Sequence, residues 1–140
     1  MCVVWRWVGF MSHIVLVAVW VDGKVLLVKN SYRSQYSLPA GDKHRKETSA
    51  FAASRELREE TGVIVAPTQL TCVFKLNEDE AWRNAPKHNE IFECRLENEP
   101  NISVDNREVI HAGFYTLDAA LSLPIPEVIR IYLRLQSRKR

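Results

Sequence analysis

The sequence predicts an α/β fold of the α+β kind, in which one mixed β-sheet is flanked by about two helices. Two β-branched apolar runs, residues 13–21 and 24–30, enclose an Asp-Gly pair, and a helix-like segment follows at residues 48–61. Further apolar runs alternate with polar segments up to a second helix-like segment near residue 127. Because strands and helices interleave without a regular strand–helix–strand rhythm, a mixed sheet is favoured over a doubly wound parallel one.

The first two runs are predicted to form a hairpin. An Asp-Gly pair, here Asp22 and Gly23, is a strong hairpin signal when it separates β-branched apolar runs. The next segment, residues 30–47, is polar and rich in turn-forming residues, and Pro39 and Gly41 exclude a regular helix. We expect a loop there, with a short extended piece at residues 37–39.

The following helix has signals at both ends. Thr48 or Ser49 can cap its start, and Gly62 stands just after its last periodic residue. Later strands are expected at residues 69–76, 91–97 and 112–117. The apolar positions expected to face the sheet are Ala50, Ala53 and Leu57 in this helix, and Val128, Ile131, Tyr132 and Leu135 in a terminal helix that starts at Pro126-Glu127.

Length and composition bound the class of protein. At 140 residues the chain has the size of one ordinary domain, and we expect a single domain over residues 1–140. Nineteen basic and 17 acidic residues give a formal charge of +2, which is too balanced for a nucleic-acid footprint. The cysteines Cys2, Cys72 and Cys94 include no C-x-x-C pair, so we expect neither a disulfide framework nor a structural cysteine-zinc site. A reducing cytoplasm is the predicted location.

The apolar N-terminal segment resembles an export signal only superficially. Arg6 and the pair Ser12-His13 interrupt it, and it is shorter than the 18 or so residues of a spanning helix. It also has no small-residue cleavage site before the charged stretch. We therefore expect no signal peptide and no membrane anchor. Met11 offers a second start, in which case residues 1–10 are an upstream or disordered extension.

The helix at residues 48–61 carries three acids on one face. Glu56, Glu59 and Glu60 stand three and four residues apart, so their carboxylates are neighbours within an arc of roughly 100°. An ordinary solvated face would pair Arg55 with Glu59, but Glu56 and Glu60 would still repel each other and oppose the helix dipole. A hard divalent cation such as Mg²⁺ removes this conflict. Local rules broken together favour a functional site.

Residues 41–63 match the pattern G-x5-E-x7-R-E-U-x-E-E-x-G-U, where U is aliphatic, at every position. The matching residues are Gly41, Glu47, Arg55, Glu56, Leu57, Glu59, Glu60, Gly62 and Val63. This segment resembles the Nudix box, the motif of the Nudix hydrolase family. Chance produces so many fixed identities in one window only rarely. The resemblance implies an α/β/α sandwich around a mixed β-sheet.

The resemblance also implies the chemistry. Glu56, Glu59 and Glu60 would hold the catalytic ions, Mg²⁺ or Mn²⁺, and Arg55 looks like the residue that orients them. Glu47 resembles the box glutamate that binds metal or fixes the loop. The implied reaction is attack of water on phosphorus in the diphosphate bridge of a nucleoside diphosphate linked to another moiety. Glu59, Glu60 and Arg55 are therefore the expected catalytic residues of the box.

Two further positions extend this set. Many family members have glycine where Ala40 stands, and its backbone carbonyl often contributes to metal binding, so Ala40 joins the expected metal site. A later acid acts as base or extra ligand in many members, and Glu108 stands at a comparable place before an expected strand. Glu90 and Glu93 compete for this role. Glu108 can equally be an ordinary exposed acid, since acids mostly lie at the surface.

Substrate contacts are expected outside the box. Residues 77–90 are too polar for a strand and long for a hairpin loop, so we predict a mobile recognition loop there. In it Trp82 could stack on a base, while Arg83, Lys87 or His88 could meet phosphate. Upstream of the box, Arg33 and Tyr36 are further candidates. The simpler alternative for each is an ordinary loop residue.

The resemblance leaves the substrate open, because subfamily signatures for ADP-ribose, diadenosine polyphosphate and coenzyme A hydrolases are absent. The expected partner is a small nucleotide diphosphate, with no membrane and, given the charge balance, no nucleic acid; a homodimer is left open. One alternative is a Nudix-fold module that senses a nucleotide without cleaving it, although a pure binder does not need all three helix acids. Another is an RNA 5′-end pyrophosphohydrolase, whose basic surface could only be the tail at residues 134–140.

Overall fold

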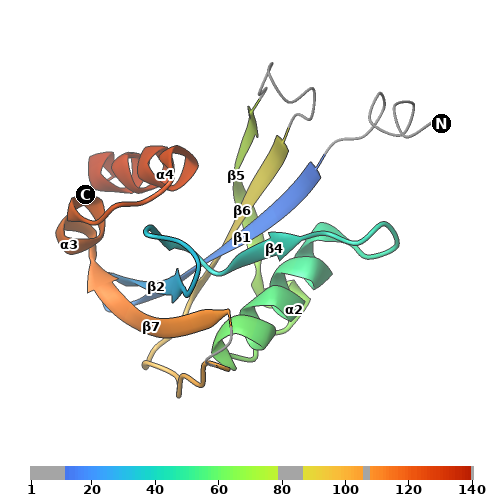
Figure 1. Cartoon of the computed structure of the whole chain (residues 1–140), viewed down its shortest axis with the longest axis horizontal. Coiled ribbons are helices and arrows are strands. Elements are labelled where there is room, and N and C mark those ends of the chain that lie inside the picture. The colour runs from blue at the N-terminus through green and yellow to red at the C-terminus, as the bar shows by residue number, and fades with distance from the viewer. Residues whose placement is uncertain (1–11, 79–86, 106–107, 140) are drawn as a thin grey trace.

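The computed structural model describes residues 12–78, 87–105 and 108–139 (Figure 1). The first half holds β1 (Ser12–Val21), β2 (Lys24–Asn30), β3 (Tyr36–Ser37), β4 (Ala40–Asp42) and α2 (Ser49–Thr61). A 3₁₀ turn, η1 (Pro67–Gln69), leads to β5 (Thr71–Glu78) and β6 (Lys87–Arg95). The last elements are β7 (Val109–Thr116), α3 (Leu117–Ser122) and α4 (Glu127–Arg138).

The strands form one mixed sheet, as predicted. Its order is β3-β2-β1-β6-β5, with β4 also paired to β1 and β7 to β2. The pair β1–β6 is parallel, while the other pairs are antiparallel. Strand β1 is thus central, and its run from Val15 to Val21 is buried throughout, which is typical of a strand covered on both faces.

Helices cover the two faces of the sheet, which gives the α/β/α sandwich (Figure 1). Alternate residues of β1 point to opposite faces. Leu16, Ala18 and Trp20 join a core cluster with α3 and α4. Val15, Val17 and Val19 join a second cluster with α2. The helix that carries the acids is therefore anchored on the central strand.

The hairpin between β1 and β2 is confirmed. Trp20 pairs with Val25 and Val21 with Lys24, so Asp22 and Gly23 are the two turn residues. Their φ angles are 50° and 75°. A two-residue turn with both angles positive matches the twist of the flanking strands, which explains the Asp-Gly pair.

Helix α2 begins and ends where the sequence predicts. The Thr48 hydroxyl accepts a hydrogen bond of 3.1 Å from the Phe51 amide, and Gly62 has φ 77° and donates to the Arg58 carbonyl. The predicted stripe is confirmed, because Ala53 and Leu57 are buried and Ala50 packs against the same core cluster; Ala52 is buried as well. The helix also contacts η1 and β4. Its buried face is therefore wider than the predicted stripe.

The prediction of a loop over residues 77–90 is wrong at both ends. Asn77 pairs with His88 and Glu78 with Lys87, so β5 and β6 extend into this polar segment. Strand β5 lies at the edge of the sheet and exposes many of its side chains, and cross-strand polar pairs replace the apolar alternation expected of a strand. Trp82 and Arg83 lie outside the described residues.

The face of α4 is rotated from the predicted one. Its buried residues are Val128, Ile129, Tyr132 and Leu133, whereas Leu135 is exposed. The Tyr132 hydroxyl accepts a hydrogen bond of 2.9 Å from Trp20 Nε1 and donates to Glu93, which fixes the helix rotation. Helix α3 was not predicted; its start is capped by the Thr116 hydroxyl.

Two further sequence expectations concern compartment. In the described part of the chain, Cys72 and Cys94 are free thiols. Over the same residues, every helix is too short or too polar to cross a membrane.

Candidate active site

A cavity of about 600 Å³ opens beside the end of α2 that carries the acids. Its wall combines residues that are far apart in the sequence, from β1, β2, the loop after β2, β4, α2, β6 and α4. The predicted site residues in this wall are Arg33, Ala40, Glu56, Glu60, Lys87 and Glu108, whereas Glu47 and Glu59 lie outside it. The fold therefore brings together acids from the box helix and an acid that directly precedes the last strand.

Strand β4 holds the backbone of the site against α2. Ala40 pairs with Leu16 and Gly41 with Val15, so this segment is fixed on the central strand. The Ala40 amide donates a hydrogen bond of 3.1 Å to Glu60 Oε1. Ala40 has an ordinary strand backbone, and among the described non-glycine residues only Asp22 has a positive φ. Alanine therefore fits this position without strain.

Gly41 is required by a close approach. A Cβ added there would lie 2.1 Å from Cδ of Glu56, and its φ is not positive. Any side chain at this position would displace the Glu56 carboxylate. The glycine of the box thus makes room for a carboxylate of the same box.

Arg55 contacts three of the acids. Its guanidinium donates two hydrogen bonds to Glu47, of 2.6 and 3.1 Å, and one of 2.7 Å to Glu56. It reaches Glu59 at 3.4 Å and donates to the Asp42 carbonyl at 3.0 Å. The sequence predicted only the contact with Glu59. The crowding of acids on α2 is therefore partly compensated by one cation of the same helix.

Glu47 is held as the partner of Arg55. It also accepts a hydrogen bond of 2.8 Å from the His44 amide. The hydrogen bonds from Arg55, acting against partial burial, lower the pKa of Glu47 to about 2. Of its two predicted roles, fixing the loop is the one that these contacts describe.

Glu60 has much less compensation. Burial, together with the nearby charges of Glu56, Glu108 and Glu59, raises the pKa of Glu60 to about 8, although the Ala40 amide opposes the shift. Burial also raises the pKa of Glu56, despite its hydrogen bond from Arg55. Two carboxyls in the cavity wall thus favour either a proton or a cation beside them.

The three later acids lie in different surroundings. Glu108 is exposed, lines the cavity, and accepts a hydrogen bond from the Ser31 amide through its backbone carbonyl. Glu90 instead accepts a hydrogen bond from Ser49 at the start of α2. Glu93 accepts one from Tyr132, on the opposite face of the sheet. Only Glu108 shares the cavity with the box acids.

The predicted substrate contacts separate into three groups. Arg33 lines the cavity, and its guanidinium lies 5.6 Å from the ring centroid of Tyr32. Tyr36 packs edge-on against Tyr115 and lies outside the cavity wall. Trp82 and Arg83 are not among the described residues.

Several further polar residues of the cavity wall, namely Asn30, Tyr32, Gln35 and Asn89, were not among the site residues predicted from the sequence. They lie at strand ends and in a loop far apart in the sequence. Tyr32 had one usable sequence signal, because it is a large aromatic in a polar turn; in the structure its side chain is 65% exposed.

Comparison with known proteins places this geometry in a family. The family model described as "NUDIX domain" matches residues 11–135. A MutT NUDIX hydrolase from Burkholderia pseudomallei superposes with a TM-score of 0.76 at 21% identity, over 88% of this chain and 95% of that one. An Ap4A hydrolase from C. elegans has a TM-score of 0.75 at 20% identity, over 92% and 97%. The NUDIX domain of Shewanella oneidensis NrtR, complexed with ADP ribose, has a TM-score of 0.75 at 17% identity, over 100% and 99%. No curated protein matches the chain.

Proposed function

Because the chain belongs to the Nudix family, we propose that it is a Mg²⁺- or Mn²⁺-dependent hydrolase of a nucleoside diphosphate linked to another moiety. One observation carries the proposal most directly. Glu56 and Glu60 line the same cavity, and burial raises the pKa of both. A divalent cation would relieve the cost of ionising them, and a diphosphate brings the same need for positive charge.

The oxygen donors of the site suit a hard cation. Glu56, Glu59 and Glu60 would hold the metal, together with the carbonyl of Ala40, and all of these are oxygen ligands. Glu59 has a side chain that is 51% exposed, so it can turn toward a cation at little cost. When bound, the metal would neutralise charge on the bridging phosphates and make water a better nucleophile.

Arg55 acts on this site through the acids. Its contacts to Glu47 and Glu56 hold one of the proposed metal ligands in place, whereas the half-exposed Glu59 can still turn. Its bidentate pairing with Glu47 also ties the loop before α2 to the helix. We therefore assign Arg55 and Glu47 as positioning residues, since neither needs to touch the substrate for the site to form.

Glu108 is the proposed general base. It lies in the cavity wall, and its charge contributes to the raised pKa of Glu60. An exposed carboxylate can accept a proton from a water molecule that attacks phosphorus. Glu90 and Glu93, held in other hydrogen bonds, have no access to this cavity in the described structure.

Substrate recognition is proposed to fall to the loop after β2. Arg33 offers a planar cation for phosphate, and the exposed ring of Tyr32 beside it offers a surface for a base. Trp82 and Arg83 stay candidates from the sequence alone. Tyr36 is left out of the proposed contacts, because its ring packs edge to face against the rings of Tyr115 and His111.

A panel of nucleoside diphosphate compounds tests the proposed reaction. ADP-ribose, diadenosine polyphosphates and nucleoside triphosphates are incubated with the protein and Mg²⁺, and products are identified by chromatography. We expect a nucleoside monophosphate or its equivalent from at least one compound. Tight binding of a compound without any product across the panel would instead indicate a nucleotide-sensing module.

Metal binding itself predicts a change in thermal stability. Millimolar Mg²⁺ or Mn²⁺ should raise the melting temperature of chelator-treated protein, because a ligand that binds only the folded state stabilises it by mass action. Differential scanning calorimetry across a metal titration measures the effect. Melting that stays constant over the whole titration would contradict metal binding at the box.

A further inference from the structure

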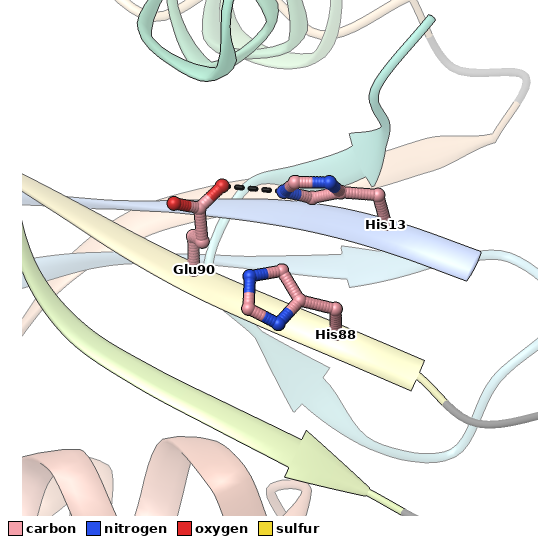
Figure 2. A group of neighbouring side chains, drawn as sticks. All are labelled: His13, His88 and Glu90. Atoms are coloured by element: carbon pink, nitrogen blue, oxygen red, sulfur yellow. Dashed lines mark hydrogen bonds and ion pairs between the residues drawn. The ribbon is translucent and has the colours of Figure 1, made fainter. Parts of the chain in front are cut away.

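A second group of potential metal ligands lies away from the cavity, on the α2 face of the sheet (Figure 2). It consists of His13 on β1 and of His88 and Glu90 on β6. The parallel register places His13 directly beside His88. One donor atom from each of the three side chains lies within 4.8 Å of the other two. Within the described residues, no other set of three such side chains meets this criterion.

The donors already point toward one another. His13 Nε2 hydrogen-bonds Glu90 Oε1, and the His13 and His88 rings meet edge to face with centroids 4.6 Å apart. Figure 2 shows one ring nitrogen of His88 directed toward the Glu90 carboxylate and the other turned away from it. Glu90 is the buried member, with a side chain that is 9% exposed, while the His13 side chain is 31% exposed. The group is thus built around a buried acid and opens toward solvent.

An outer layer of hydrogen bonds orients these donors. The Ser49 hydroxyl donates a hydrogen bond of 2.6 Å to Glu90 Oε1. His88 Nδ1 hydrogen-bonds the side-chain oxygen of Asn77 on β5. A ligating histidine commonly donates its second ring N–H to such an oxygen, which leaves the other nitrogen free for a metal. The contact between His88 Nδ1 and Asn77 therefore orients the ring so that Nε2 can serve as the metal ligand.

An ordinary ion pair accounts for only part of this arrangement. An ion pair would explain the contact between His13 and Glu90. It would not explain why the His88 ring packs against the His13 ring with a nitrogen directed toward the same carboxylate. Lys75 lies 3.9 Å from the other oxygen of Glu90, but its side chain is 64% exposed and can move away. Cys72 Sγ lies 3.9 Å from that same oxygen and adds a further soft donor nearby.

We propose that His13, His88 and Glu90 form a second metal site, selective for Zn²⁺ or a similar transition-metal cation and separate from the box acids. Two imidazoles and one carboxylate are a donor set typical of zinc sites with three protein ligands and an open fourth position. Mg²⁺ prefers oxygen ligands and would not compete well for imidazole nitrogen. The cation would take the place of the proton that His13 and Glu90 share, and that proton would leave to solvent. The inference stands whether or not the chain hydrolyses a nucleotide.

Zinc binding under excess Mg²⁺ is the test. Chelator-treated protein is titrated with Zn²⁺ in millimolar Mg²⁺, and bound zinc is measured after gel filtration. We expect about one zinc per chain, as a single three-ligand site requires, and a higher melting temperature because the cation joins β1 to β6. His88→Gln should weaken binding by about 100-fold or more, beyond the roughly 10-fold expected for loss of the outer-layer hydroxyl in Ser49→Ala.

Two control variants test whether zinc binds at this site or elsewhere on the chain. His111→Gln removes a histidine that hydrogen-bonds Tyr115 on β7, and it should leave zinc binding unchanged. Glu60→Gln removes a box acid and should leave this zinc in place. Zinc lost in Glu60→Gln but retained in both His13→Gln and His88→Gln would overturn the proposal.

Co²⁺ absorption provides a measurement that needs no variant. Cobalt bound to wild-type protein under the same Mg²⁺ excess should give the intense visible bands of a four-coordinate site with nitrogen ligands. Weak bands of a six-coordinate oxygen site alone would also overturn the assignment.

Discussion

Glu60→Gln should reduce diphosphate hydrolysis by about a thousandfold or more while making the metal-free protein more stable. Losing metal charge at the bridging phosphates removes several kcal/mol of transition-state stabilisation, and each 1.4 kcal/mol is about tenfold in rate. The amide keeps the shape of the side chain and can still accept the hydrogen bond from the Ala40 amide. Activity and stability should therefore move in opposite directions.

The stability gain has a defined pH dependence. The pKa of Glu60 is raised to about 8 from an ordinary value of 4.5, so the folded state favours the protonated acid. Without metal, the contribution of Glu60 to wild-type stability should be most favourable below about pH 4.5 and should be lost as the pH rises toward 8. The glutamine variant lacks this loss, and its advantage should reach on the order of 1–3 kcal/mol near pH 8.

Denaturant unfolding in a chelator at several pH values measures this difference. Glu59→Gln is the matched control, because its side chain is half exposed and adjoins the same site. It should lose activity with little change in metal-free stability. If Glu60→Gln instead lowers metal-free stability by more than about 2 kcal/mol, Glu60 belongs to a structural polar network.

Gly41→Ala should also abolish most activity, by displacing Glu56. The added Cβ would lie 2.1 Å from Glu56 Cδ, so the carboxylate has to move away from the cavity wall. Because the Glu56 carboxylate is the end of a flexible side chain, it can move without disturbing the backbone. The fold should therefore survive with a stability loss of about 1 kcal/mol. Mg²⁺ affinity, measured by calorimetry, should fall together with turnover.

Gly113→Ala is the control for a glycine in the same sheet. Its added Cβ would have His111 Nε2 as its nearest neighbour, at 3.4 Å, which is ordinary van der Waals contact. It should keep both metal binding and activity. Full activity in Gly41→Ala would contradict the role given to Glu56.

Local signals made much of this fold predictable. The Asp22-Gly23 turn and the caps Thr48 and Gly62 depend on residues adjacent in the sequence, and the structure confirms each of them. The strands over residues 77–78 and 87–90 were missed because cross-strand partners, rather than alternating apolar residues, stabilise them. The rotation of α4 depends on Tyr132 meeting Trp20, 112 positions away, and no local pattern carries that information.

The candidate site also combines features that the local sequence predicts with features that depend on tertiary packing. The spacing of Glu56, Glu59 and Glu60 predicts neighbouring positions on one helix, but only Glu56 and Glu60 line the cavity. That Arg55 binds Glu47 as well, and that Gly41 makes room for Glu56, depends on how β4 packs against α2. The group of His13, His88 and Glu90 had no sequence signal, because the parallel pairing of β1 with β6 creates it.

The acids of α2 are proposed to hold a metal that drives water attack on a diphosphate. Turnover of the best panel compound in heavy-oxygen water, with Mg²⁺ and with wild type beside Glu60→Gln, tests it most directly. Wild type should place one heavy oxygen in a phosphate of one product, and only when Mg²⁺ is present, whereas the variant should place almost none. Equal incorporation by both proteins, or undiminished incorporation in a chelator, would contradict it.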